Sequence, residues 1–288
     1  MKNFILASRP KTLLAGVLPP LVAYAYYMST SKESSVIYMW FAVFGALFIQ
    51  LATNFFNDVI DFEKGADKKR VGPTRVSAAG LVDIKTVKKW AIGCVTMAAL
   101  CGVPLIYRGG WPFLILGVVS LYLTYGYTGG KVSLAYRGLG ELFVFLFFGL
   151  FSVMGSFYLF SLQLNWGAFI LASVFGLLAT TLIMINNLRD RETDAEVGKK
   201  TLATRFSAKT YQLFILVTIF APYLLLHYFR DLKMIYWVFL GLVPALKLTQ
   251  ITLTKKGADL NEGLKFSGIH LIVLSLLLSF TFIYESSL

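Results

Sequence analysis

Apolar stretches of about 20 residues recur along almost the whole chain. A helix of that length crosses the roughly 30 Å hydrocarbon core of a lipid bilayer. The composition agrees, because 57% of the 288 residues are hydrophobic and only 15% are charged, whereas soluble domains are about 25% charged. The sequence therefore predicts an all-α membrane protein.

We predict nine membrane-spanning helices. No long polar insert or linker separates them, so residues 1–288 are expected to form a single integral-membrane domain. The expected spans are 12–28, 36–56, 90–107, 112–129, 139–160, 167–187, 211–229, 234–253 and 266–284.

The basic residues are distributed unevenly between the two sides of this predicted bundle. The N-terminus and the loops after the second, fourth, sixth and eighth spans carry 22 of the 27 Lys and Arg residues. Cytoplasmic loops are enriched in Lys and Arg, so we expect a multi-pass protein of the cell inner membrane, with its N-terminus in the cytoplasm and its C-terminus outside. This topology accounts for most of the net charge of +12, and we expect no nucleic-acid partner.

Two of the basic loops, after the second and the sixth spans, resemble each other. Each begins with asparagine, continues with aspartates, and ends in a group of cations. When Asp61 is superposed on Asp190, the asparagines align and Arg75 falls within one position of Arg205. This internal repeat predicts two similar four-helix halves with a ninth helix added, an arrangement that enzymes and transporters both use.

The carboxylates in these loops have helical spacing. Asp58 and Asp61 are three residues apart, and Asp190 and Asp194 are four apart, so each pair shares one helix face and repels. A hard divalent cation would offset that repulsion, and Mg²⁺ is typically held by one or two carboxylates together with phosphate oxygens. We therefore predict a site for Mg²⁺ and a diphosphate, with nearby cations on the free phosphate oxygens; those cations are Arg70, Arg75, Lys199, Lys200 and Arg205.

Ordinary solvated helix ends are the alternative interpretation of these loops. Gln50 and Asn54, however, extend the polar face one and two turns back into the bilayer. A merely exposed loop has no need of such an extension.

At these residues the chain resembles the UbiA superfamily of membrane-embedded aromatic prenyltransferases, and within it the 1,4-dihydroxy-2-naphthoate polyprenyltransferases of menaquinone synthesis. The resemblance extends over nearly the whole chain. It is carried by SRPKTL (8–13), NDVIDFEKGAD (57–67), RVGPTR (70–75), YTGG (127–130), LAYRGLGELFVFLFFG (134–149) and NNLRDRETDAEVGKKTLATR (186–205).

The resemblance implies a set of metal ligands and a substrate site. The superfamily pattern NDxxDxxxD ends at Gly65 in this chain, and Asp67 is expected to take the last position. A YxxxK element is matched by Tyr127 and Lys131, whose ammonium would meet the diphosphate. The expected metal ligands are Asn57, Asp58, Asp61, Asp67, Asn187, Asp190 and Asp194, and the expected substrate-binding residues are Asn54, Arg70, Arg75, Tyr127, Lys131, Arg137, Lys199, Lys200 and Arg205.

The reaction implied is transfer of a polyprenyl group from polyprenyl diphosphate to an aromatic acid, here 1,4-dihydroxy-2-naphthoate, with loss of CO₂ to give demethylmenaquinol. Another aromatic acceptor, such as 4-hydroxybenzoate or homogentisate, or haem, is the nearest alternative. A cation-coupled transporter is the alternative from another class, but it would need a polar path to the outer side, and no acidic residue lies in the outer part of any predicted span.

Within that reaction, Asp58, Asp61, Asp190, Asp194, Lys131 and Glu141 are the expected catalytic residues. Glu141 either caps its helix or acts as a base toward an acceptor hydroxyl. Arg137 or Arg9 either binds the acceptor carboxylate or simply belongs to the basic cytoplasmic side. Phenylalanines near the start of the fifth span either shield an allyl cation or face lipid and core; they are Phe143, Phe145, Phe147 and Phe148.

Overall fold

The computed structural model describes residues 2–31, 36–65, 72, 74–130 and 133–288. Three predicted site residues, Asp67, Arg70 and Lys131, lie outside the described residues. In the described part of the chain every regular element is a helix, which confirms the predicted all-α class.

The chain begins with a short helix and four long ones: α1 (Lys2–Ser8), α2 (Pro10–Thr30), α3 (Val36–Glu63), α4 (Ile84–Gly109) and α5 (Trp111–Gly126). One continuous helical rod then comprises α6 (Gly140–Val144), the π-helix η1 (Phe145–Met154) and α7 (Gly155–Ser161). The remaining elements are α8 (Trp166–Arg189), α9 (Arg191–Glu196), α10 (Leu202–Arg205), α11 (Ala208–Leu226), η2 (His227–Phe229), η3 (Ile235–Gly241), α12 (Leu242–Thr254), η4 (Gly257–Asp259) and α13 (Leu260–Ser286).

Eight helical rods in the described residues are long and apolar enough to cross a membrane. The remaining predicted span, the fourth (112–129), corresponds to α5, an apolar helix of 16 residues. At 1.5 Å per residue such a helix is about 24 Å long, which is short for the hydrocarbon core. The number of full spans is therefore eight by this measure, with α5 as a shorter companion.

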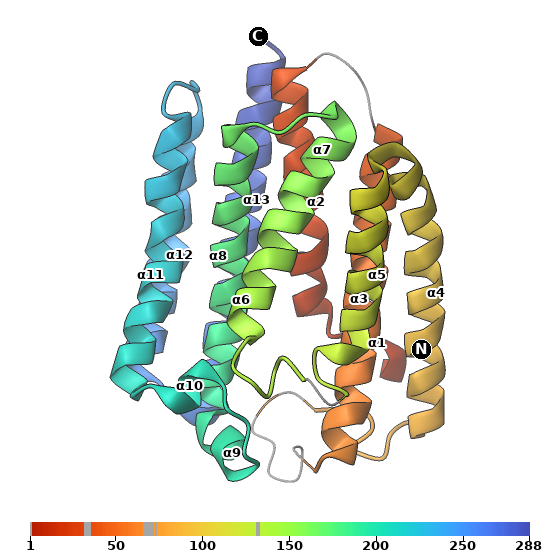
Figure 1. Cartoon of the computed structure of the whole chain (residues 1–288). Coiled ribbons are helices and arrows are strands. Elements are labelled where there is room, and N and C mark those ends of the chain that lie inside the picture. Colours follow the sequence, from red (N-terminus) through yellow and green to blue (C-terminus); the bar gives the residue numbers. More distant parts are fainter. Residues whose placement is uncertain (1, 32–35, 66–71, 73, 131–132) are drawn as a thin grey trace.

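The rods stand side by side as one bundle with α8 at its centre (Figure 1). α8 packs against the π-helix η1, against α11 and against α13, and α13 also packs along α2. In the most apolar window of α8, 72% of the residues are buried inside the protein, compared with 28% in α3 and 22% in α4. α8 is thus the core helix, whereas α3 and α4 leave most of their surface for lipid.

Close packing at glycine joins η1 to α8. A Cβ on Gly149 would lie 2.5 Å from the carbonyl oxygen of Ala172 and 2.5 Å from the Cα of Gly176. A Cβ on Gly176 would in turn lie 2.6 Å from the ring of Phe145. Only residues without side chains allow this approach, so the two glycines set how closely the π-helix lies against the core.

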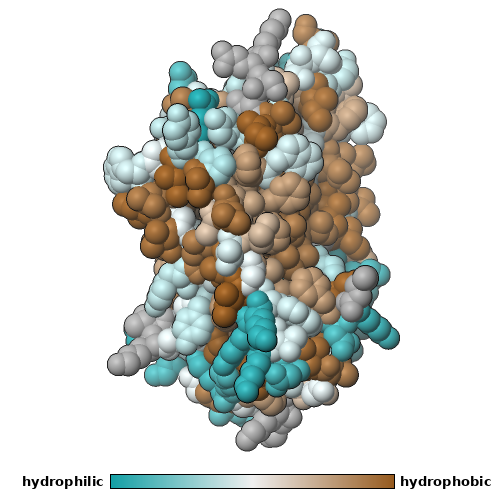
Figure 2. Space-filling view, turned by 90° about the vertical axis from the view of Figure 1, so that its right-hand side faces the viewer, coloured by the Kyte–Doolittle hydropathy of each residue, from teal (hydrophilic) through white to brown (hydrophobic). Residues whose placement is uncertain are grey.

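The polar surface gathers at one end of the bundle. Figure 2 shows an apolar band around the middle and a cluster of hydrophilic side chains at the lower end. That end also holds α9, α10 and the connections that follow α3 and α5 (Figure 1). The candidate site residues lie in these connections and in the helix turns beside them, and the C-terminus lies at the opposite end of the bundle.

Candidate active site

The first acidic motif occupies the last turns of α3. Asp58 is 1% exposed, and its two carboxylate oxygens accept the backbone N–H groups of Val76 at 3.1 Å and Ser77 at 2.9 Å. Asn57 accepts the Thr128 hydroxyl at 2.5 Å on its side chain and the Arg75 guanidinium at 2.6 Å on its backbone carbonyl. Asp58 therefore holds the loop that contains Val76 and Ser77 against α3. A carboxylate with these two hydrogen bonds still keeps lone pairs that could bind a cation.

Asp61 lies one turn further along the same helix and is surrounded by cations. Arg75 forms an ion pair with its Oδ2 at 2.6 Å, and the Tyr136 hydroxyl donates to its Oδ1 at 3.3 Å. Arg9 and Lys199 also act on this carboxylate through space. The loop cation predicted to meet phosphate, Arg75, thus already lies beside the predicted metal ligand.

The second acidic motif follows the end of α8. Asp190 receives both arms of the Arg189 guanidinium, at 2.7 and 2.6 Å, and the same guanidinium reaches Asn186 and Asn261. The Arg189 side chain is fully buried. The bidentate pair therefore holds the junction at which α8 ends and α9 begins.

Among the predicted carboxylate ligands that the structure describes, Asp194 accepts the fewest side-chain hydrogen bonds. Its Oδ1 accepts from Lys199 at 3.3 Å, while its buried Oδ2 accepts no hydrogen bond. Burial raises the pKa of Asp194 above its usual range, although Lys199 opposes the change. A buried carboxylate oxygen with no partner is the kind of atom that a bound cation would satisfy.

The two motifs are joined by the loop of residues 133–139, which connects α5 to α6. Tyr136, in this loop, donates its hydroxyl to Asp61 and accepts the backbone N–H of Lys200 at 3.1 Å. Burial and the Asp61 carboxylate raise the pKa of Tyr136, so its phenol remains protonated and acts as a donor. The Arg205 guanidinium adds a bond to the Arg137 carbonyl at 2.7 Å.

A glycine makes the contact between these loops possible. Gly138 has a φ of 75°, and a Cβ at this position would lie 2.6 Å from the carbonyl oxygen of Lys200. The left-handed conformation and the lack of space both favour glycine. The 133–139 loop therefore packs directly on the loop of the second motif.

Glu141 lies at the start of α6 inside a buried polar cluster. Its Oε1 accepts from the Asn187 amide at 2.9 Å and from the Tyr211 hydroxyl at 2.7 Å, and its Oε2 is buried without a hydrogen-bond partner. Burial, and then the charges of Glu141 and Asp61, raise the pKa of Tyr127. Asn187 of the second motif therefore contacts Glu141, and Tyr127 lies within the electrostatic reach of both acids.

Asn54 ties the N-terminal segment to α3. Its amide donates to the Ser8 carbonyl at 2.8 Å and to the Thr12 hydroxyl at 3.0 Å, and its Oδ1 accepts from Gln50. Arg9, between the two tied residues, has a left-handed backbone with φ of 50°. The predicted extension of the polar face into the bilayer is thus used to hold the junction of α1 and α2.

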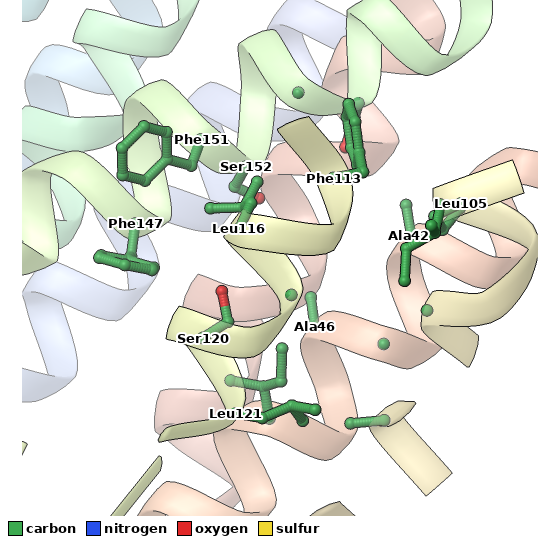
Figure 3. Close-up of a pocket in the computed structure, with 18 of the residues that line it drawn as sticks. Ala42, Ala46, Leu105, Phe113, Leu116, Ser120, Leu121, Phe147, Phe151 and Ser152 are labelled. Atoms are coloured by element: carbon green, nitrogen blue, oxygen red, sulfur yellow. The ribbon is translucent and has the colours of Figure 1, made fainter. Parts of the chain in front are cut away.

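An apolar cavity of about 350 Å³ lies among α3, α4, α5 and the π-helix (Figure 3). Ala42 and Ala46 of α3, Leu105 of α4, Leu116 of α5 and Phe147 of η1 line it, and Figure 3 shows them around a common space. Its few polar lining residues are Gln50, Ser120, Ser152 and Ser156. Of the four phenylalanines singled out in the sequence, Phe147 and Phe148 line this cavity, whereas Phe145 packs against Gly176.

The donor set fits Mg²⁺ shared with a phosphorylated ligand. Among the described residues, no three His, Cys, Asp or Glu side chains gather closely enough to hold a metal alone. Mg²⁺ usually takes only one or two carboxylates and completes its shell with water and substrate phosphates. The unsatisfied Oδ2 of Asp194 and the adjacent Asp61 match that pattern.

The structure thus brings together Asn57, Asp61, Arg75, Asp194 and Lys199. Asp58 and Asp190, in the same two motifs, are held by hydrogen bonds from the Ser77 backbone and from Arg189. The side chains of Arg137 and Lys200 are exposed at the surface of the two loops that carry them. Sequence reasoning missed Tyr136, Tyr211, Arg189 and Lys64, whose ammonium donates to the Thr128 carbonyl at 2.6 Å. Tyr136 is the third residue of the LAYRGLGELFVFLFFG stretch (134–149). A tyrosine between the two basic motif loops was the sequence feature that could have identified it as a site residue.

A bundle of membrane helices with two acidic helix ends and their cations at one end defines a polytopic membrane protein with a candidate site for a metal ion and phosphate. The sequence matches the UbiA prenyltransferase family over residues 17–281. The chain belongs to this family.

Individual relatives agree with that assignment. The chain is 34% identical to 1,4-dihydroxy-2-naphthoate octaprenyltransferase of Escherichia coli over 251 residues, which cover 83% of this chain and 80% of that protein. It is 28% identical to the protein of the same name from Mycobacterium leprae, over 94% and 92% of the two chains. The fold resembles a UbiA homologue from Archaeoglobus fulgidus bound to GPP and Mg²⁺, with a TM-score of 0.67, 13% identity, and coverage of 98% and 99%.

Proposed function

We propose that the protein transfers a polyprenyl group from polyprenyl diphosphate to 1,4-dihydroxy-2-naphthoate. The carboxylate leaves as CO₂, and the products are demethylmenaquinol and diphosphate. The observation that carries the proposal is the convergence of Asp61, Asp194 and Lys199 around Tyr136. The relatives named for this acceptor in Escherichia coli and Mycobacterium leprae support the choice of naphthoate.

The polar end of the bundle would hold the diphosphate. Asp61 and Asp194 are the proposed primary metal ligands, with support from Asn57, Asp58, Asn187 and Asp190. Mg²⁺, when bound, would neutralise diphosphate oxygens and stabilise the leaving group as a Lewis acid; the structure of the Archaeoglobus homologue is described as bound to GPP and Mg²⁺. Arg75, Lys199, Lys200 and Arg205 would donate to the remaining phosphate oxygens.

The apolar cavity among α3, α4, α5 and η1 suits the prenyl tail. Its lining is almost entirely aliphatic and aromatic, so the tail would be buried while the diphosphate stays at the polar end. Phe147, Phe148 and Phe151 present aromatic rings there, and aromatic faces stabilise a nearby cation by about 0.5–2 kcal/mol each. The same lining excludes the water that would otherwise capture an allyl cation.

The acceptor needs a group for its hydroxyl and a cation for its carboxylate. Glu141 is the proposed base, because its buried Oε2 has no hydrogen-bond partner while Asn187 and Tyr211 hold its Oε1. Arg137 is the proposed carboxylate-binding residue, because its side chain is exposed in the 133–139 loop that leads into α6. Tyr127 would contribute its phenol beside Glu141.

We place the protein in the cell inner membrane, with the polar end of the bundle in the cytoplasm. The Lys and Arg residues of the loops at that end support this orientation through the positive-inside rule. The soluble acceptor and the diphosphate would then meet the site from the cytoplasm, and the prenyl tail would meet it from the bilayer.

The test is an assay of the purified protein with Mg²⁺, a polyprenyl diphosphate and a panel of aromatic acids, read by mass spectrometry. We expect a prenylated, decarboxylated product from 1,4-dihydroxy-2-naphthoate, and less product from an equal concentration of 4-hydroxybenzoate. If 4-hydroxybenzoate is the preferred acceptor, the naphthoate assignment is wrong. If no aromatic acid is prenylated, the whole proposal fails.

A further inference from the structure

Lys64 is a cation at the site that the sequence motifs do not assign. It is the first residue after α3, one turn beyond Asp61. Its ammonium donates to the Thr128 carbonyl at 2.6 Å and lies 4.0 Å from the centroid of the Tyr136 ring. An ammonium has three N–H donors, so the Thr128 bond leaves capacity for a ligand.

A second lysine approaches the same ring from the other motif. Lys199 lies 5.7 Å from the Tyr136 centroid and donates to Asp194 at 3.3 Å. Ammonium groups within about 6 Å of an aromatic face are attracted to it. Two cations, one from each half of the chain, therefore converge on one aromatic ring.

The ring itself is fixed from both sides. The Tyr136 hydroxyl donates to Asp61, and its backbone carbonyl accepts from the Lys200 N–H. The tight contact of Gly138 with Lys200 adds a steric constraint. Tyr136 is thus held in place by both acidic motifs.

Lys64 and Lys199 are like charges at one ring, so an anionic ligand between them would offset their repulsion. In the described residues, Asp61 lies between Arg75, Lys64 and Lys199. Arg75 already forms the ion pair with Asp61, so Lys64 is not needed to neutralise it. Lys64, bonded to the Thr128 carbonyl, and Lys199, paired with Asp194, each keep further N–H donors for a diphosphate at this site.

We propose that Lys64 is a further diphosphate-binding residue, and that Tyr136 is the positioning residue that holds Lys64 and Lys199 as a pair of ammonium groups. This inference rests on the proposed function. When the bond between the allylic carbon and the diphosphate oxygen breaks, its electron pair stays on that oxygen. The two ammonium groups donate N–H bonds to the departing diphosphate and offset its charge.

The experiment measures binding of inorganic pyrophosphate, in the presence of Mg²⁺, to the full-length protein by calorimetry. The variants are Lys64→Met, which keeps the aliphatic stem, Tyr136→Leu, which removes the ring, and Tyr136→Phe, which keeps it. Lys88→Met is the matched control, because Lys88 forms an exposed pair with Glu63 at 2.7 Å near the same helix end. The melting temperature of each variant is recorded alongside.

We expect Lys64→Met to raise the Kd for pyrophosphate about tenfold, the size of one charge-assisted hydrogen bond. Tyr136→Leu should raise the Kd at least as much, because both ammonium groups lose the aromatic ring that holds them. The Kd values of Tyr136→Phe and Lys88→Met should stay within about twofold of the parent value. In the double variant Lys64→Met/Tyr136→Leu, the two losses in binding free energy should be less than additive.

Parent-like binding by Lys64→Met overturns the assignment of Lys64, and this outcome does not depend on whether Tyr136→Leu folds. Additive losses in the double variant overturn the positioning role of Tyr136. The proposed function fails separately: a parent that binds pyrophosphate with Lys64 dependence but prenylates no aromatic acid would refute the transferase and leave the anion site standing.

Discussion

At the scale of single residues, the acidic motifs divide into two kinds of carboxylate. Asp58 and Asp190 are held in place by the protein, the first by two backbone N–H groups and the second by the buried Arg189. Asp61 and Asp194 face cations that a ligand could draw away. The spacing in the sequence predicted the two pairs, but it could not distinguish these kinds, because the partners of Asp58 come from 18 and 19 residues away.

The first prediction is that Asp61→Asn abolishes prenyl transfer while the protein stays folded and inserted. The amide keeps the size of the side chain but removes the charge that would hold Mg²⁺. Chelation of the parent with EDTA should have the same effect, and added Mg²⁺ should restore activity. Turnover by mass spectrometry and gel filtration in detergent are the two measurements. Full turnover in Asp61→Asn would mean that the first motif is only a solvated helix end.

The second prediction concerns Arg137. If its guanidinium binds the acceptor carboxylate, Arg137→Ala should raise KM for the naphthoate about tenfold or more, and should change KM for the prenyl diphosphate less than twofold. Arg191→Ala is a matched control, since Arg191 donates instead to the carbonyls of Ala203 and Phe206. Equal effects on both substrates would assign Arg137 to the loop structure instead.

At the scale of helices, the apolar pattern located the spans but not their internal geometry. The expected fifth span, 139–160, corresponds closely to the rod from Gly140 to Ser161. Its central ten residues, however, form the π-helix η1, which has the same composition as an ordinary apolar helix. π-helical turns often occur at functional sites, and this one places Phe147 and Phe151 along the cavity. It lies in close contact with α8 through Gly149 and Gly176.

The third prediction tests that contact. Gly149→Ala should destabilise the protein by about 1–3 kcal/mol, because the new Cβ would meet backbone atoms of α8, which cannot rotate away. Gly93→Ala in α4 is the control, since nothing lies within 4 Å of its Cβ position, and alanine favours a helix over glycine by up to about 1 kcal/mol. Thermal unfolding in detergent should show a lower Tm for Gly149→Ala alone. An unchanged Tm would show that η1 and α8 separate easily.

At the scale of the whole molecule, the sequence predicted a repeated bundle with its chemistry at one end. The described residues confirm the all-helical bundle, and the two acidic motifs lie at the same end of it. The two motifs are connected through the loop of residues 133–139, which contacts Asp61 and Lys200 and is not part of the internal repeat. A pattern of apolar spans cannot predict where such a loop packs. The charge distribution is a property of this scale as well. In the proposed function the cations of the motif loops bind diphosphate, and by the positive-inside rule the same cations, together with those of the other loops, would orient the bundle in the membrane.

The fourth prediction is therefore the orientation itself. The termini lie toward opposite ends of the bundle (Figure 1), as they would if the short α5 crosses the membrane along with the eight full spans. In a background with Cys94 and Cys101 replaced by alanine, Ser287→Cys should react with a membrane-impermeant maleimide on intact cells. Val197→Cys, exposed beside the second motif, should react only after the cells are made permeable, because the basic loops hold that end in the cytoplasm. Reaction of both cysteines on intact cells would place the site and the C-terminus on one side, and would refute both the orientation and the cytoplasmic access to the site that the proposed reaction needs.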